Sequence, residues 1–272
     1  MIKKCALILI ISGIYSSSIF AQNDKNYNFN NKGKLYVYWG WNLSAYSQSD
    51  IHFKGNNYNF TLYDVIGRDR QTPELNEYVN PGTMTIPQYN ARIGYYINDK
   101  YSISIGNDHM KYVMKTGQTA VIDGVIDAGT IYDKVYDNEE IEVAYNFLIF
   151  EHTDGLNYEN IDFRRHFRLK QIKDFSFDAF GGIGAGIMLP KTNVTLFRGE
   201  RFDEFHVAGY GINLLAGANL TYKGRYFIMS EIKGGYTNLP DIRVSPDRSE
   251  TASQKFYFFQ YNILFGVNIQ IK

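Results

Sequence analysis

Three short segments of this sequence place a histidine close to carboxylate and amide side chains. They are 49–55 (Ser-Asp-Ile-His-Phe-Lys-Gly), 107–111 (Asn-Asp-His-Met-Lys) and 151–158 (Glu-His-Thr-Asp-Gly-Leu-Asn-Tyr). Histidine titrates near neutral pH, and a nearby carboxylate can orient its ring and stabilise its charged form. Such a pair can take a proton from a hydroxyl group or from water. The three segments are therefore candidates for hydrolytic chemistry.

Two pairs within these segments are the candidate catalytic residues. His152 and Asp154 are two positions apart, so in a regular strand they share a face and point together. Asp108 and His109 are adjacent, so they point apart unless a β-bulge brings both into one site. Each pair is a candidate base and orienting carboxylate for activating a water molecule.

The same segments also suit two readings without catalysis. Ca²⁺ prefers carboxylate and amide oxygens, and the candidate ligands are Asp108, Glu151, Asp154 and Asn157. Alternatively, the segments are polar rims whose side chains hydrogen-bond the backbone around a barrel mouth. The spacing of the residues does not decide among these readings, so the sequence leaves open whether the protein is an enzyme.

The elements that must position these residues read as β-strands. From Tyr257 to Ile271, every second residue is apolar, and the intervening positions hold mostly Gln, Asn and Gly. Similar alternation predicts about ten strands, with an apolar exterior and a polar interior. Their ranges are 35–45, 57–65, 88–98, 100–113, 140–151, 158–170, 174–188, 206–221, 225–237 and 254–271.

The first 34 residues predict export and a short lead-in. Lys3 and Lys4 precede an apolar run at 5–14, and Ala21 ends a Ser-rich stretch, as in a signal peptide. That run is too short for a membrane-spanning helix, which needs about 20 residues. The predicted division is a signal peptide at 1–21, a disordered lead-in at 22–34 and an antiparallel transmembrane β-barrel at 35–272.

Composition excludes several classes of protein. Loss of Lys3 and Lys4 with the signal peptide leaves 26 basic and 28 acidic residues, so no basic stripe for nucleic acid is expected. The single cysteine, Cys5, lies in the signal peptide, which leaves no disulfide or Cys-based metal site.

The segments 189–206 and 238–253 read as extracellular loops, in which Arg198 and Arg201 are candidate contacts for lipopolysaccharide phosphates.

The long terminal strand resembles the closing strand of Gram-negative outer-membrane β-barrel proteins. The three segments, in turn, resemble segments of a group of such proteins that has no known activity. These resemblances imply the outer membrane as location, with its lipid, its lipopolysaccharide and the barrel assembly machinery as partners. The sequence does not predict the oligomeric state.

A local resemblance concerns His152-Thr153-Asp154-Gly155. It is similar to the His-x-Ser-Asn-Gly motif of outer-membrane phospholipase A and keeps its His and Gly, but Asp154 occupies the place of the nucleophilic serine. The resemblance implies a lipid-active hydrolase of the phospholipase type. A separate alternative is that His and Asp activate a water molecule, as in small barrels that remove acyl chains from lipid A.

The inward positions of the predicted strands carry charges of both signs: Arg92, Glu142, Asp162, Arg164, His166, Arg168, Asp178, Glu231 and Lys233. A barrel of about ten strands has little free lumen, so these side chains are expected to pair and fill it. The leading prediction is a structural barrel, or one that binds lipid or a small ligand at its mouth. The alternatives are the hydrolase and a narrow channel.

One conflict remains in the predicted topology. Short turns should face the periplasm, and those at 173–174 and 223–225 do, whereas the turn at 98–100 falls on the opposite side. A further strand at 119–126, with a second change near 66–86, would give twelve strands instead of ten.

Overall fold

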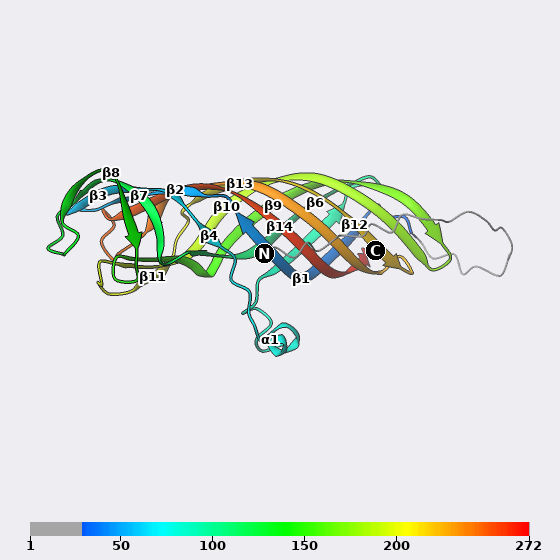
Figure 1. Ribbon diagram of the computed structural model, residues 1–272. Coiled ribbons are helices and arrows are strands. Elements are labelled where there is room, and N and C mark those ends of the chain that lie inside the picture. The colour runs from blue at the N-terminus through cyan, green and yellow to red at the C-terminus, as the bar shows by residue number, and fades with distance from the viewer. Residues whose placement is uncertain (1–28, 272) are drawn as a thin grey trace, which may run out of the picture.

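Eight antiparallel strands close into a ring in the computed structural model, which describes residues 29–271 (Figure 1). Around the ring they are β1 (Lys34–Tyr46), β5 (Tyr89–Tyr96), β6 (Tyr101–Met114), β9 (Leu148–Ile172), β10 (Phe175–Leu196), β12 (Gly209–Tyr222), β13 (Tyr226–Arg243) and β14 (Thr251–Gln270). Pairing of β1 with β14, from Lys34 opposite Gln270 to Tyr46 opposite Phe258, closes the ring. The predicted all-β antiparallel barrel is confirmed.

The outer face of the ring is apolar, because alternate residues of each strand point outward. Exposed outward side chains include Val37, Ile93, Ile103, Phe163, Phe177, Ile183, Ile212, Leu214, Ile228, Phe259, Ile263 and Phe265. Alternate positions are buried and mainly polar, as in Ser102, Ser104, Asp162 and Asn262. An apolar exterior around a polar interior is the architecture of an outer-membrane β-barrel.

None of the helices among residues 29–271 has the length and apolar character needed to cross a membrane.

The three hairpin turns lie at the same end of the ring as the start of β1 and the end of β14. Leu35 at the start of β1 lies opposite Ile269 and also opposite Tyr95, just before the turn at 97–100. The turns at 173–174 and 223–225 join β9 to β10 and β12 to β13. All three are therefore periplasmic by the short-turn rule, and the conflict over the turn at 98–100 disappears.

The conflict arose from the number of strands in the ring. The predicted strand at 57–65 forms outside the ring. The predicted strand at 140–151 is divided between the end of β8 (Lys134–Val143) and the start of the long β9, which also contains 158–170. The ring therefore has eight strands where the sequence suggested about ten. The predicted strand at 119–126 does form, also outside the ring.

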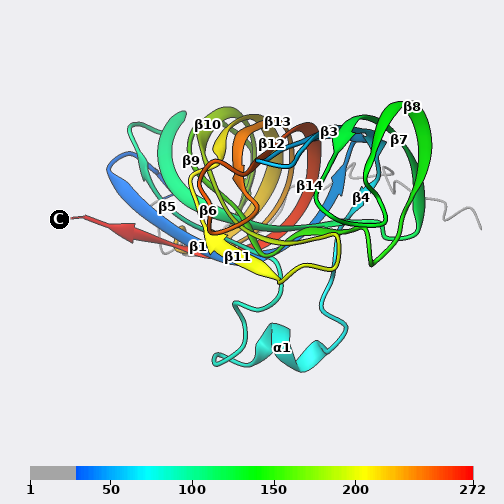
Figure 2. The ribbon, with the colours of Figure 1, turned by 90° about the vertical axis from the view of Figure 1, so that its left-hand side faces the viewer.

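Beyond the ring, at the end away from the turns, the sheet continues as an extension. It consists of β2 (Ser49–Lys54), β3 (Tyr58–Val65), β7 (Gln118–Ile126) and β8 (Lys134–Val143), together with the ends of β6, β9, β10, β13 and β14 that run past the ring. β2 pairs with the start of β14, and β3, β7 and β8 follow in order. Figure 2 shows these strands beside the barrel mouth.

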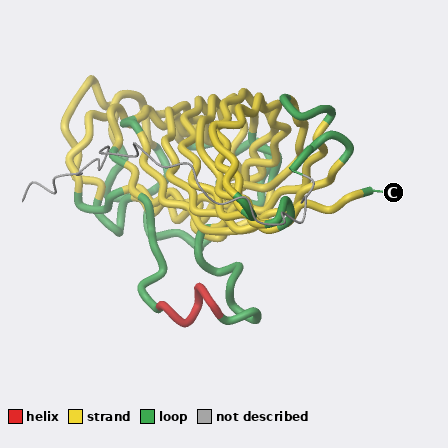
Figure 3. Tube along the Cα trace, turned by 90° about the vertical axis from the view of Figure 1, so that its right-hand side faces the viewer, coloured by secondary structure: helices red, strands yellow, loops and turns green. Residues whose placement is uncertain are grey.

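Smaller elements flank the extension. β4 (Gly67–Arg68) pairs with β6, and β11 (Phe202–Phe205) pairs with β10. The short helix α1 (Leu75–Val79) stands away from the barrel wall on its own loop (Figure 3).

β8 is the outer edge of the extension. It pairs with β7 alone among the described strands, and its exposed residues include Asp137, Glu140 and Glu142. Acidic side chains on a free edge discourage pairing with another chain. The prediction that Glu142 faces the lumen is therefore wrong, because its strand lies outside the ring.

The start of the described chain falls within the predicted lead-in. Phe29 is buried, and its carbonyl oxygen accepts a hydrogen bond from Arg168 (3.1 Å). The backbone amide of Asn31 donates to Asp99 in the turn at 97–100 (2.8 Å). The predicted signal peptide at 1–21 and residues 22–28 of the lead-in lie outside the described residues.

We predict that Leu214→Arg destabilises the folded barrel by about 2–4 kcal/mol, because Leu214 is exposed in the lipid-facing belt and a mid-membrane arginine costs that much. The matched change Val135→Arg, at an equally exposed apolar side chain on the water-facing β8, should cost less than about 0.5 kcal/mol. Urea unfolding in phosphocholine liposomes measures both changes. Equal effects would contradict the assignment of the belt.

Candidate functional site

Six charged side chains meet inside the ring and form what we call the lumen network. It contains Arg92, Arg164 and Lys233 with Asp108, Asp162 and Glu231, and all six side chains are 0% exposed. They come from β5, β6, β9 and β13, at positions where strand alternation points the side chain inward. Three positive and three negative charges leave the network neutral.

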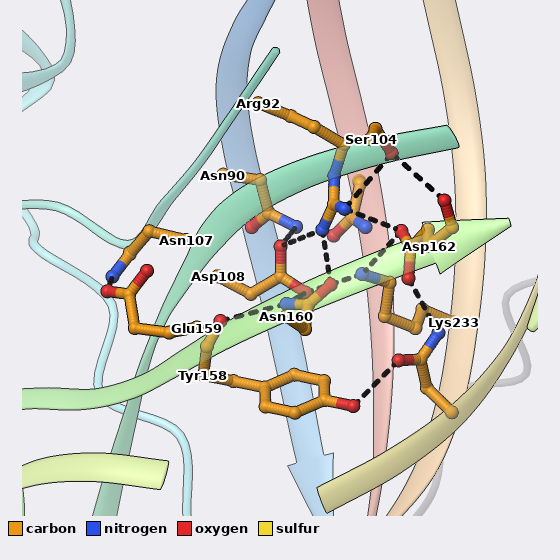
Figure 4. Close-up of polar contacts among 12 residues, drawn as sticks. Asn90, Arg92, Ser104, Asn107, Asp108, Tyr158, Glu159, Asn160, Asp162 and Lys233 are labelled. Carbon is orange, nitrogen blue, oxygen red and sulfur yellow. Dashed lines mark hydrogen bonds and ion pairs between the residues drawn. The ribbon is translucent and has the colours of Figure 1, made fainter. Parts of the chain in front are cut away.

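Asp162 is the centre of the lumen network. Its carboxylate lies 3.0 Å from Arg92 Nη1, 3.1 Å from Arg164 Nη2 and 3.5 Å from Lys233 Nζ. One carboxylate thus contacts all three cations of the network, which ties β5, β9 and β13 together across the lumen. Figure 4 shows Asp162 with Arg92 and Lys233.

Asp108 forms a second node of the lumen network. Its carboxylate lies 2.5 Å from Lys233 Nζ and 3.4 Å from Arg92 Nη2. It also accepts hydrogen bonds from the amides of Asn90 (3.0 Å) and Asn160 (3.1 Å). With four donors around it, this carboxylate is held in a fixed position.

Apolar side chains fill the ring on both sides of the lumen network. On the periplasmic side lies a buried cluster of Tyr36, Tyr38, Tyr96, Phe180, Leu215, Phe227, Met229 and Leu264. On the extension side lies a larger buried cluster, the apolar plug, which includes Phe53, Phe60, Phe147, Phe150, Tyr112 and Phe256. Tyr158 belongs to the plug and reaches the network through Asn213 (2.9 Å), which itself donates to Asp162 (3.2 Å).

The candidate base His152 is buried in the apolar plug. Its Nδ1 lies 2.8 Å from Thr192 Oγ1, and its ring packs against the rings of Tyr112 and Phe150. Burial lowers the pKa of His152 to about 4, so the ring is neutral at pH 7. None of the hydrogen bonds or ion pairs found among residues 29–271 joins His152 to a carboxylate.

Asp154 lies on the opposite side of the sheet from His152. Its side chain is 48% exposed and forms an ion pair with Lys191 (3.1 Å). Gly155 adopts φ +132°, and the β6–β9 register shifts between Met110 and Tyr112, so strand alternation is interrupted here. The prediction that His152 and Asp154 share a face is therefore wrong.

The second candidate pair is also separated. Asp108 points into the lumen network, whereas His109 Nδ1 lies 2.8 Å from Asn157 Oδ1 and its ring stacks on Tyr89. The two side chains point apart, as expected for neighbours in a regular strand. Whether any of these four residues takes part in a reaction stays a prediction.

The four predicted Ca²⁺ ligands do not come together. Asp108 belongs to the lumen network, Asp154 to the Lys191 ion pair, and Asn157 contacts His109, while Glu151 pairs with Arg70 (3.3 Å). Within residues 29–271, no group of three His, Cys, Asp or Glu side chains is placed to hold a metal ion. A calcium site thus stays a prediction that this geometry does not support.

A cleft of about 550 Å³ lies on the outer face of the extension, beside β4, β6 and β9. Its charged lining residues are Arg68, Asp69, Arg70, Lys115 and Glu151, and Tyr145, Ile149 and Val113 add apolar surface. Of these, only Glu151 was singled out from the sequence. The segment 66–86 shows no strand alternation, so no sequence pattern indicated that Arg68 and Arg70 would lie against the ends of β6 and β9.

The predicted lipopolysaccharide contacts lie on a different part of the extension. Arg201 Nη2 is 2.7 Å from Asp203 and 3.8 Å from Asp154. Arg201 is therefore already paired with carboxylates, and contact of Arg198 or Arg201 with lipopolysaccharide stays a prediction.

Neither a protein-family model nor a curated protein matches this chain. Among solved structures, the attachment invasion locus protein Ail of Yersinia pestis is 10% identical, with 86% of this chain and 99% of its own covered and a TM-score of 0.31. The outer membrane protein OprG of Pseudomonas aeruginosa is 11% identical (89% and 98% covered, TM-score 0.40). The outer membrane protease OmpT of Escherichia coli is 8% identical (88% and 98%, TM-score 0.27). We transfer no activity from these proteins.

We predict that Asp108→Asn costs roughly 3–5 kcal/mol of barrel stability, because it removes the nearest counter-charge of Lys233 and leaves the buried lumen network with one positive charge in excess. The double variant Asp108→Asn/Lys233→Met restores neutrality and should cost less than the sum of the two single variants. A double-mutant cycle by urea unfolding measures this coupling. Strict additivity would show that the two charges do not interact.

We also predict an acid-sensitive extension. Because the pKa of His152 is about 4 when folded and 6.5 ordinarily, its contribution to stability is complete above pH 6.5. That contribution is lost as pH falls from 6.5 towards 4, by on the order of 3 kcal/mol. Hydrogen exchange of β2 and β3 amides at pH 7 and pH 5 measures this loss. His152→Gln should remove the pH dependence. The control is His206→Gln, at a half-buried histidine that lies 2.8 Å from Asp241, and it should leave the pH dependence intact.

Proposed function

We propose that this protein is a sealed outer-membrane barrel that does not conduct solutes and presents its extension outside the cell as a binding surface. The observation that carries the proposal is the lumen network, whose six charged side chains are 0% exposed. If an aqueous path ran through the ring, these charged side chains would be exposed to water.

The two apolar clusters support the same conclusion. An ion crossing the ring would have to pass the periplasmic cluster, then the lumen network, then the apolar plug. An isolated charge in apolar surroundings is strongly disfavoured, so each cluster is a barrier in series with the next. The channel predicted as an alternative from the sequence has little support in this arrangement.

The outer face of the extension is not required to be apolar, so it can carry the polar and charged side chains of a binding site. Strands in lipid must keep an apolar outer face, whereas the extension meets water and carries charged side chains on its outer face. Binding sites commonly occupy such segments held on a rigid scaffold. The hydrolase alternative stays a prediction, and among the described residues His152 makes no hydrogen bond or ion pair with a carboxylate.

We predict that the refolded wild-type protein gives no ion-conductance steps in planar lipid bilayers, because the lumen is filled from end to end. Insertion is checked by floating the same preparation with liposomes, and folding by heat-modifiable gel mobility. A reproducible single-channel conductance from folded, inserted protein would contradict the proposal of a sealed barrel and would support the narrow channel instead.

A further inference from the structure

The cleft beside β4 faces the medium and not the lipid. Val113, which lines it, lies eight residues along β6 from Ile105, the last strongly exposed apolar side chain of that strand. At about 3.3 Å per residue, this is roughly 26 Å of strand beyond the apolar belt. A ligand in the cleft would therefore arrive from outside the membrane core.

The two acids of the cleft are already engaged by protein donors. Asp69 accepts hydrogen bonds from the backbone amide of Ser44 (2.8 Å) and from the side chain of Gln88 (2.5 Å). Glu151 accepts from Asn193 (2.8 Å) and pairs with Arg70 (3.3 Å). Both carboxylates are thus bound by donors of the protein itself, and these contacts stabilise the cleft.

Two cations of the cleft are not engaged in this way. The side chains of Arg68 and Lys115 have no hydrogen bond or ion pair with any residue from 29 to 271. Lys111 lies close to the same cluster, and burial together with the positive charge of Arg70 lowers its pKa. Unneutralised positive charge around a cleft favours an anionic ligand, and arginine suits phosphate and carboxylate groups.

The rest of the lining is apolar and aromatic. Tyr145 is 73% exposed at the rim, Val113 and Ile149 are partly buried, and Phe150 and Met114 are buried behind them. A tyrosine ring offers a flat apolar face with a polar tip, which suits the C–H face of a sugar ring. The volume of about 550 Å³ lies in the usual range for small-ligand sites.

We propose that this cleft binds a sugar unit that carries a phosphate or carboxylate group. Arg68 and Lys115 hold the anionic group, and Tyr145 packs on the sugar ring. The proposal rests on the proposed function of the extension as a binding surface and names the chemical class that it binds.

The test is a titration of the detergent-solubilised full-length protein with glucose 6-phosphate, glucose and inorganic phosphate, followed by calorimetry or by NMR of the ligand. Glucose 6-phosphate should bind more tightly than either of the other two. Arg68→Ala/Lys115→Ala should weaken glucose 6-phosphate binding at least about tenfold, since charged hydrogen bonds are lost. Tyr145→Ala should weaken it about fivefold and leave phosphate binding unchanged.

The matched control is Arg248→Ala/Lys54→Ala, which removes one arginine and one lysine from exposed positions of the extension outside the cleft. It should bind as the wild type does, and all variants must show wild-type heat-modifiable mobility. Absence of glucose 6-phosphate binding by the wild type, or equal losses in the test and control variants, would overturn the proposal. Neither result would bear on the proposal that the barrel is sealed, because the conductance measurement tests that proposal separately.

Two sources could supply such a sugar, and a second titration separates them. The protein is placed in nanodiscs with or without lipopolysaccharide, and glucose 6-phosphate is added again. Weaker apparent binding in the presence of lipopolysaccharide identifies the saccharide of the membrane itself as the ligand. Unchanged binding identifies a soluble or foreign saccharide.

Discussion

The hydrogen bonds of the backbone in lipid are the constraint on which this structure depends. A strand in the hydrocarbon layer must be paired on both edges, because no water is present to satisfy a free amide or carbonyl. Pairing of β1 with β14 meets this requirement and fixes a ring of eight strands. The same constraint ends where the membrane ends, so the extension can remain an open sheet with β8 as an edge protected by acidic side chains.

An eight-stranded ring leaves room only for side chains inside, and this explains the interior. Some strand positions must be glycine so that a large neighbour fits, as at Gly94, where a Cβ atom would collide with the ring of Tyr36. The charges of the lumen network are tolerated because they sum to zero and contact one another. Such a network adds little net stability over apolar packing, but it penalises any register that separates its members.

The charged side chains of the barrel and those of the extension have different environments. Inside the ring, each charged side chain of the lumen network is paired and inaccessible, so it stabilises one arrangement of strands. On the outer face of the extension, Arg68 and Lys115 keep their charge available. The apolar plug connects the two regions and holds the long ends of β9 and β10 in place without support from lipid.

The sequence by itself determined the membrane barrel. Alternation in segments such as 257–271 is a local property of the chain, because side chains of a strand point to opposite faces whatever the strand pairs with. The three hairpin turns and most inward residues, including Asp162 and Lys233, follow from the same rule. Alternation carries no information about which strands enter the ring, however, so β3 and β7 could not be told from membrane strands.

Only the tertiary structure decided the arrangement of the candidate sites. The irregularity near Gly155 turns Asp154 away from His152, and a backbone break of this kind cancels the parity argument made from spacing. The cleft joins Arg68 and Lys115, which are 47 positions apart, through the pairing of β4 with the end of β6. That contact depends on long-range packing of a segment without any periodic pattern, so the sequence alone could not reveal it.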